Sequence, residues 1–263
     1  MSEICQACVP IRPWDDVRLA RLPGLVPIEP GEWVQVDDAY AGQMAHRQAL
    51  LASRRDQVLR QVPEAGEGLA ELYERVLAEL RGRGDFRFDG DRVTCPDARV
   101  VRLDPARPLE TLAALVQEDF CLLQKPAGGE EHVMTAALLC FPASWTLNEK
   151  FGRPLTAIHG PVAEYSADMA RRVQRLFDGV QPERPIWRAN CLLYDDPELH
   201  QPRREAERRA PVTDGRKWVR IERQSIVKLA KTGDVVFSIH SYVLPLERFA
   251  RQDRQAILAR TRK

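Results

Sequence analysis

The stretch that decides the fold is Ile186-Trp187-Arg188-Ala189-Asn190-Cys191-Leu192-Leu193-Tyr194, which follows the turn-like pair Arg184-Pro185. Polar and apolar residues alternate in its centre with a period of two, which is typical of a β-strand whose two faces meet different environments. The alternation places Arg188 and Asn190 on the same face of this strand.

Two later segments repeat the pattern. Residues 218–227 put Arg220, Glu222 and Gln224 on one face, and residues 234–243 put Ser238, His240 and Tyr242 opposite Val235, Phe237 and Ile239. If the three strands pair in one antiparallel sheet, we expect their polar residues to form a single face. A solvated face would give the same alternation. The mixture of amide, imidazole, phenol, guanidinium and carboxylate groups is more typical of a binding pocket.

The preceding sequence adds the other elements of this module. Strands are expected at 120–123 and 133–141, short helical or loop pieces at 145–152 and 154–159, and an amphipathic helix at 164–177. This order is that of a PAS domain, an α+β fold in which an antiparallel sheet carries helices on one face and a ligand pocket between them. We therefore predict a PAS-like core at residues 118–246.

The remaining sequence extends the core at both ends. Residues 1–117 are predicted to form a helical extension, with helices near 37–58, 67–80 and 108–117 and a small hairpin that turns at Asp89-Gly90. Residues 247–263 are predicted to form a basic helix.

Composition limits the class of protein. The chain has 263 residues, of which 44% are hydrophobic and 29% charged, and its formal net charge is +1. This charge gives no drive toward nucleic acid, and no segment approaches the roughly 18 apolar residues of a membrane span. The first residues lack the apolar stretch of a signal peptide. We expect a soluble, cytoplasmic protein with neither nucleic acid nor membrane as partner.

The six cysteines do not form the spacing of a disulfide framework. Cys5-x-x-Cys8 could be half of a zinc or redox site, but no second pair stands at metal spacing. The patterns of an iron–sulfur ferredoxin, a dinucleotide fingerprint and a phosphate loop are also missing. Electrons for any redox chemistry would therefore come from another protein.

Several blocks along the chain resemble one family. They are Val36-Asp37-Asp38-Ala39-Tyr40 with Arg47, Gln117-Glu118-Asp119-Phe120-Cys121-Leu122-Leu123, Cys140-Phe141-Pro142-Ala143-Ser144-Trp145, Glu149-Lys150-Phe151-Gly152-Arg153-Pro154-Leu155, Ile158-His159-Gly160-Pro161-Val162, Trp187-Arg188-Ala189-Asn190, Leu199-His200-Gln201-Pro202, and Arg220-Ile221-Glu222-Arg223-Gln224 with Gly233. In this order they resemble the haem-dependent oxidative N-demethylases. Cys191 and His240 depart from the family pattern, which usually has an aromatic residue and an arginine at these positions.

The resemblance implies a PAS fold that binds haem b and a subunit that oxidises a small methylated amine with O₂, releasing formaldehyde. Electrons would come from NADPH through a separate reductase with flavin and iron–sulfur groups. A homo-oligomer is also compatible with the sequence. A haem-PAS sensor of gas or redox state and a haem-free relative that binds a small ligand are the alternatives.

A haem iron needs a protein ligand, most often histidine. Of the five histidines, His159 is the first candidate for the axial ligand, because it stands before Gly160-Pro161, where a rigid turn could aim its imidazole into the pocket. His200 and His240 are the other candidates for contact with the haem. His46 is expected at the surface.

The remaining roles follow from charge. Glu222 could hold the ammonium group of an amine, and Arg220, or Arg223 if a bulge turns it inward, could polarise O₂. Arg188 and Asn190 could bind the haem carboxylates, since guanidinium suits carboxylate groups. A cross-strand ion pair on a wet face is the structural alternative for Glu222 and its neighbours. Trp145 and Trp187 are expected in the core.

Overall fold

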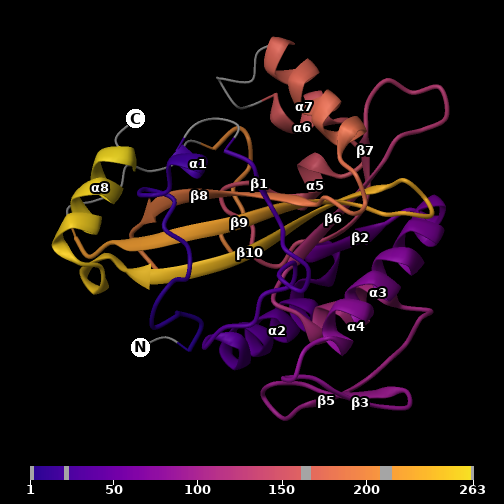
Figure 1. Cartoon of the computed structure of the whole chain (residues 1–263), viewed down its shortest axis with the longest axis horizontal. Helices are drawn as coiled ribbons and strands as arrows, with labels where there is room; N and C mark the ends of the chain where they lie inside the picture. Colours follow the sequence, from indigo (N-terminus) through magenta and orange to yellow (C-terminus); the bar gives the residue numbers. More distant parts are fainter. Residues whose placement is uncertain (1–2, 21–23, 161–166, 208–214, 262–263) are drawn as a thin grey trace.

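A computed structural model describes residues 3–20, 24–160, 167–207 and 215–261. Its centre is an antiparallel sheet of seven strands (Figure 1). The five inner strands are, in spatial order, β7 (Val133–Leu138), β6 (Asp119–Gln124), β10 (Val235–Pro245), β9 (Trp218–Lys228) and β8 (Ile186–Tyr194). Counted along the chain, these five strands are the second, first, fifth, fourth and third of the group. The α+β class and the PAS-like sheet predicted from the sequence are confirmed.

The strands β9 and β10 form the longest pairing, from Trp218 opposite Pro245 to Lys228 opposite Val235. Their β-branched and aromatic residues favour extended backbone. The turn between them is closed by hydrogen bonds between Leu229 and residues 233 and 234. Gly233 has a φ of 76°, a conformation that glycine adopts without steric cost.

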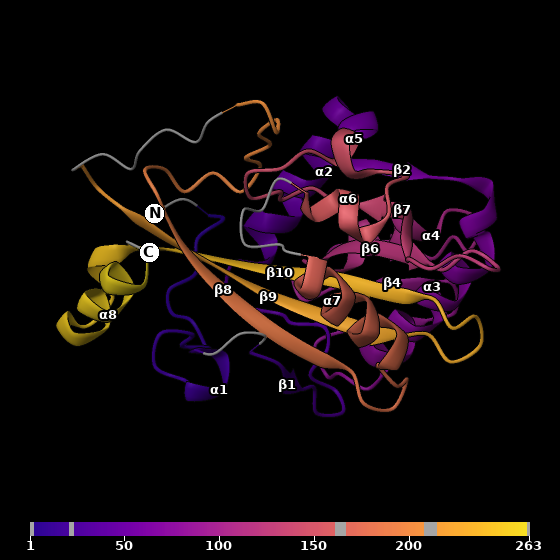
Figure 2. The same ribbon diagram turned by 90° about the horizontal axis from the view of Figure 1, so that it is seen from above.

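Helices cover both faces of the sheet. In Figure 1 the short helices α5 (Leu147–Lys150) and α6 (Leu155–His159) and the longer α7 (Ala167–Gly179) lie above it, and Figure 2 shows α7 crossing over the strands. We call the sheet surface under these helices the cavity face. Helices α2 (Tyr40–Val58), α3 (Gly66–Arg81) and α4 (Pro108–Leu115) lie on the other side, the opposite face.

The N-terminal extension is built into this sheet. Its strands β1 (Val26–Pro27) and β2 (Leu59–Gln61) pair with β8 and β7 and form the two edges. Leu69 and Leu72 of α3 share a hydrophobic cluster with Phe120 and Leu122 of β6. The apolar stripe of α3 is therefore buried against the sheet, which supplies most of the stability of such a helix.

The other elements lie at the periphery. They are α1 (Val17–Ala20), η1 (Pro63–Ala65), the small sheet of β3 (Arg87–Asp89), β4 (Arg92–Thr94) and β5 (Val100–Arg102), η2 (Leu246–Arg248) and α8 (Arg251–Thr261). The predicted N-terminal helices and the hairpin at Asp89-Gly90 are confirmed. The helix predicted from 164 starts at Ala167 within the described chain, since 161–166 lie outside it. Among the described residues, we find no helix with the length and apolar character needed to span a membrane.

One prediction about the sheet is wrong. Pairing places Ser241 opposite Glu222 and Ile239 opposite Gln224, so these residues share the cavity face. His240, with its neighbours Ser238 and Tyr242, therefore lies on the opposite face. An alternating pattern shows which residues of one strand share a face, but not which of the two faces of the sheet they occupy.

Candidate functional site

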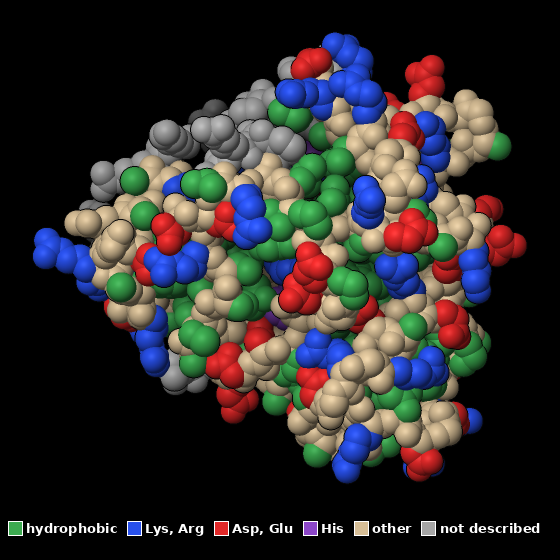
Figure 3. All heavy atoms as spheres, viewed as in Figure 1, with side chains coloured by type: hydrophobic (Ala, Val, Ile, Leu, Met, Phe, Trp, Pro, Cys, Tyr) green, Lys and Arg blue, Asp and Glu red, His purple; other side chains and the backbone are tan. Residues whose placement is uncertain are grey.

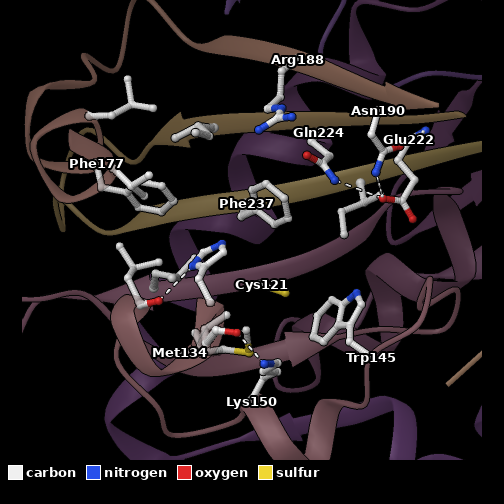
Figure 4. Close-up of a pocket in the computed structure, with 18 of the residues that line it drawn as sticks. Cys121, Met134, Trp145, Lys150, Phe177, Arg188, Asn190, Glu222, Gln224 and Phe237 are labelled. Atoms are coloured by element: carbon white, nitrogen blue, oxygen red, sulfur yellow. Dashed lines mark hydrogen bonds between the residues drawn. The ribbon is translucent and has the colours of Figure 1, made fainter. Parts of the chain in front are cut away.

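A cavity of about 960 Å³ lies between the cavity face and helices α5 to α7. Its volume is within the range of small-molecule and cofactor sites. Much of its wall is apolar and comes from both the sheet and the helices: Cys121, Leu123, Met134, Leu155, Ile158, Val173, Leu176, Phe177, Ile226, Phe237 and Ile239. Figure 4 shows Phe237, Phe177 and Met134 around its centre.

Three polar side chains form one corner of this cavity, the polar corner: Asn190, Glu222 and Gln224 (Figure 4). Asn190 and Glu222 are directly paired across β8 and β9. The Asn190 amide donates to Glu222 Oε2 at 2.8 Å and accepts from the Glu222 backbone nitrogen at 3.0 Å. The Gln224 amide donates to the same Oε2 at 3.0 Å. The corner thus presents a buried carboxylate whose orientation is fixed by two amides.

Arg220 stands behind the polar corner. Its Nη2 lies 3.3 Å from Glu222 Oε1, and the side chain is 1% exposed. It also donates to the carbonyls of Leu199 and Phe141. Arg220 is not among the residues that line the cavity, so it does not face a ligand there. Its role is that of a counter-ion to Glu222.

His159, at the end of α6, lines the cavity. Its Nδ1 lies 2.9 Å from the Leu155 carbonyl oxygen, which can only accept, so Nδ1 carries the proton. In the neutral ring the lone pair is then on Nε2, the atom a metal would bind. Burial lowers the pKa of His159, and the nearby cations Lys150 and Arg188 lower it further, which favours this neutral form.

Arg188 extends from β8 into the cavity, close to the polar corner in Figure 4. Its Nε is fully enclosed, and its guanidinium makes no hydrogen bond or ion pair with any residue that the structure describes. Burial lowers the pKa of Arg188. The charge of Glu222 acts in the opposite direction, but Arg188 forms no ion pair with Glu222 or with any other residue that the structure describes.

More cations surround the cavity: Arg172, Arg175, Arg203 and Arg204. The first two belong to α7, and Figure 3 shows Lys and Arg side chains gathered over the top of the molecule, where α7 lies. Lys150 also lines the cavity, but it is paired with Glu205 at 2.6 Å. The site as a whole has an excess of positive charge.

The structure places three other predicted site residues away from the cavity. His200 is buried, and its Nδ1 donates to the Cys140 carbonyl at 2.9 Å. Arg223 lies on the opposite face and donates to the carbonyls of Trp33 and Glu32, and β9 pairs with both neighbours without the bulge that would turn it inward. His240 lies on the opposite face as well.

His240 lies between two carboxylates, with Nε2 2.9 Å from Asp37 and Nδ1 3.1 Å from Glu118. Burial alone would lower the pKa of His240, but the hydrogen bonds and charges of these carboxylates raise it to about 9. Cys191, the other departure from the family pattern, is also buried on the opposite face. Both departures therefore lie outside the cavity wall.

Some residues that line the cavity were not predicted from the sequence to belong to the site. Trp145 was expected in the core but faces the cavity across from Glu222 (Figure 4). Lys150, Arg172 and Phe237 also line the cavity. For Phe237 the alternation in β10 showed which residues share its face, but not that this face lines the cavity.

The metal-binding residues and the family match both bear on what this cavity could hold. Within the described chain, no group of three or more His, Cys, Asp or Glu residues is placed to hold a metal ion. A haem needs only one or two protein ligands, and His159 is a histidine that lines the cavity. The model of the family described as "haem-dependent oxidative N-demethylase, alpha subunit-like" matches residues 24–262. The chain belongs to this family of haem-dependent oxidative N-demethylase alpha subunit-like proteins.

Proposed function

We propose that this chain is the haem-binding, substrate-oxidising subunit of an oxidative N-demethylase. The reaction consumes a methylated amine, O₂, two electrons and two protons, and yields the demethylated amine, formaldehyde and water. The observation that carries the proposal is the presence, in one cavity, of a neutral imidazole with a fixed tautomer and a buried, oriented carboxylate.

The cavity fits haem b. His159 would hold the iron through Nε2, and its bond to the Leu155 carbonyl would keep the ring in place. The apolar centre around Phe237 and Ile226 suits the macrocycle, and Arg172, Arg175, Arg203 and Arg204 at the cavity wall suit its carboxylates. When bound, haem supplies the activation of O₂ for oxidation of the methyl group.

Glu222 binds the ammonium group of the substrate. A carboxylate has about four acceptor positions, and the polar corner uses two of them for Asn190 and Gln224 and a third for Arg220. One position remains for a donor in the cavity. Trp145, across from Glu222, offers an aromatic surface to the methyl groups of such a cation.

We assign other roles than expected to the remaining candidates. Asn190 positions Glu222, since both ends of its amide are bonded to that residue. Arg220 positions Glu222 as its counter-ion. Electrons are supplied by a separate reductase that carries flavin and iron–sulfur groups and is fed by NADPH.

The test is a turnover assay. The haem-loaded protein is mixed with a reductase or chemical reductant, O₂ and each of dimethylamine, trimethylamine and N,N-dimethylglycine, and formaldehyde is measured. We expect formaldehyde in proportion to the amine consumed. Glu222→Gln should lower kcat/KM by about 10- to 100-fold, the effect of losing a charged hydrogen bond, and leave the haem spectrum unchanged. Haem that binds O₂ or CO without any amine turnover would instead favour a sensor.

A further inference from the structure

Two opposite charges face the cavity from neighbouring positions on the sheet. Arg188 is paired with Gln224 and Asn190 with Glu222, so the arginine and the glutamate are offset by one step of two residues along the strands. At about 3.4 Å per residue in an antiparallel sheet, this offset along the strands is about 6.8 Å. Both side chains line the cavity, and Figure 4 shows them on the same side of it.

The two charges are not equivalent within the protein. Glu222 already has a buried cation, Arg220, at 3.3 Å. Arg188 forms no ion pair among the described residues, although its Nε is enclosed, and the Glu222 charge that acts on it from further away is already paired with Arg220. A half-buried cation is stabilised when a ligand brings an anion to it, and a ligand that is only a cation would be repelled.

The two carboxylates of a haem would not supply the anion that Arg188 lacks. Four other arginines, Arg172, Arg175, Arg203 and Arg204, line the cavity, and Arg172 and Arg175 are exposed on α7. They outnumber the two carboxylates of a haem. Arg188, beside the polar corner, therefore remains to bind the same molecule as Glu222.

We propose that the substrate is a methylated amine that also carries a carboxylate, of the class of N-methylated amino acids, with its carboxylate bound by Arg188 and its ammonium by Glu222. The proposal rests on the proposed function for its chemistry, but the binding of such a zwitterion can be measured without turnover. A guanidinium binds a carboxylate through two parallel hydrogen bonds, which also fixes the direction in which the methyl groups point.

Calorimetric titration of the full chain tests the proposal, with haem bound where the protein takes it up. Three probes of similar size are compared: N,N-dimethylglycine, N,N-dimethylethanolamine, which has only the cation, and isovalerate, which has only the carboxylate. We expect N,N-dimethylglycine to bind at least about tenfold more tightly than either of the others, since each charged hydrogen bond contributes a factor of this size.

Variants locate the two contacts. Arg188→Gln should reduce the affinity for N,N-dimethylglycine to that for N,N-dimethylethanolamine and should not weaken binding of the latter. Arg188→Lys, which keeps the charge, should recover part of the loss. Arg171→Gln removes an exposed cation of α7 that does not line the cavity, and it should leave all three affinities within twofold.

The outcomes separate this proposal from the proposed function. If N,N-dimethylethanolamine binds the wild type as tightly as N,N-dimethylglycine, or if Arg188→Gln weakens both equally, the zwitterion is wrong even when formaldehyde is produced. If the protein binds no haem but holds N,N-dimethylglycine through Arg188, the ligand class stands and the oxidative function fails.

Discussion

Arg220 Nη2 lies 3.3 Å from Glu222 Oε1, and the two side chains are only 1% and 5% exposed. The same guanidinium donates to the backbone carbonyls of Phe141 and Leu199. The carboxylate that faces the cavity is thereby connected to the segment after β7, which continues into the cavity residues Ala143, Ser144 and Trp145. Arg220 thus contacts both the Glu222 carboxylate and the backbone segment that leads into the cavity wall.

Arg220→Met should destabilise the fold strongly. It leaves Glu222 buried without a cation, and removal of one partner of a buried pair costs about 3–5 kcal/mol. The measurement is the free energy of unfolding in urea. Arg216→Met is the matched control, because Arg216 forms an exposed ion pair with Glu247 that should contribute about 0–1 kcal/mol. Equal effects of the two substitutions would show that the pair is not buried as described.

Asp119→Asn should also lower the free energy of unfolding by about 3–5 kcal/mol. Asp119 pairs with Arg47 at 2.8 Å, both side chains are almost fully buried, and its carboxylate accepts the backbone N–H groups of Cys140 and Phe141. Asp91→Asn, which breaks an exposed pair with Arg102, is the control and should change stability by less than about 1 kcal/mol. A loss as small as that of Asp91→Asn would contradict the proposed importance of this buried pair.

The sequence predicted the sheet well and its faces only in part. The alternation in β8 and β9 correctly placed Arg188, Asn190, Glu222 and Gln224 together, because directly paired residues share a face. It could not assign β10, since a shift by one residue exchanges the faces. The edge strands β1 and β2 have two and three residues, too few for a periodic pattern.

Roles that depend on distant contacts could not be predicted either. His240 is a polar residue of a strand in the sequence, and only the fold brings Asp37 and Glu118 to it. Arg223 is bonded to carbonyls of Glu32 and Trp33, about 190 residues earlier in the chain. Such contacts are set by tertiary packing, which local periodicity does not contain.

His240 should make stability depend on alkaline pH. Its pKa is about 9 in the folded protein, against about 6.5 in an unfolded chain. The stabilisation by the imidazolium is therefore complete below about pH 6.5 and is lost as pH rises through 9, a total on the order of 3 kcal/mol. Asp37 and Glu118 contact the ring directly, and the Tyr242 ring lies beside it at a tilt of 57°. Arg223 carries a positive charge near Glu118 and Tyr242.

Urea unfolding from pH 6 to pH 10 measures this effect. His240→Gln should remove most of the decline above pH 7 and be less stable than wild type at pH 6. His240→Arg keeps a cation between the two carboxylates and should be stable across the range. A wild-type decline that persists unchanged in His240→Gln would assign it to another group.

The visible absorption spectrum, before and after dithionite and CO, shows whether the protein binds haem and whether His159 holds it. It should be recorded for the wild type and for His159→Ala, each expressed with a haem precursor. His132→Gln is the control, since this other buried histidine is bonded to Gln174 and does not line the cavity. We expect a Soret band that shifts on reduction in wild type and control and is lost in His159→Ala. A wild type without a Soret band, or a His159→Ala protein with the wild-type spectrum, would contradict it.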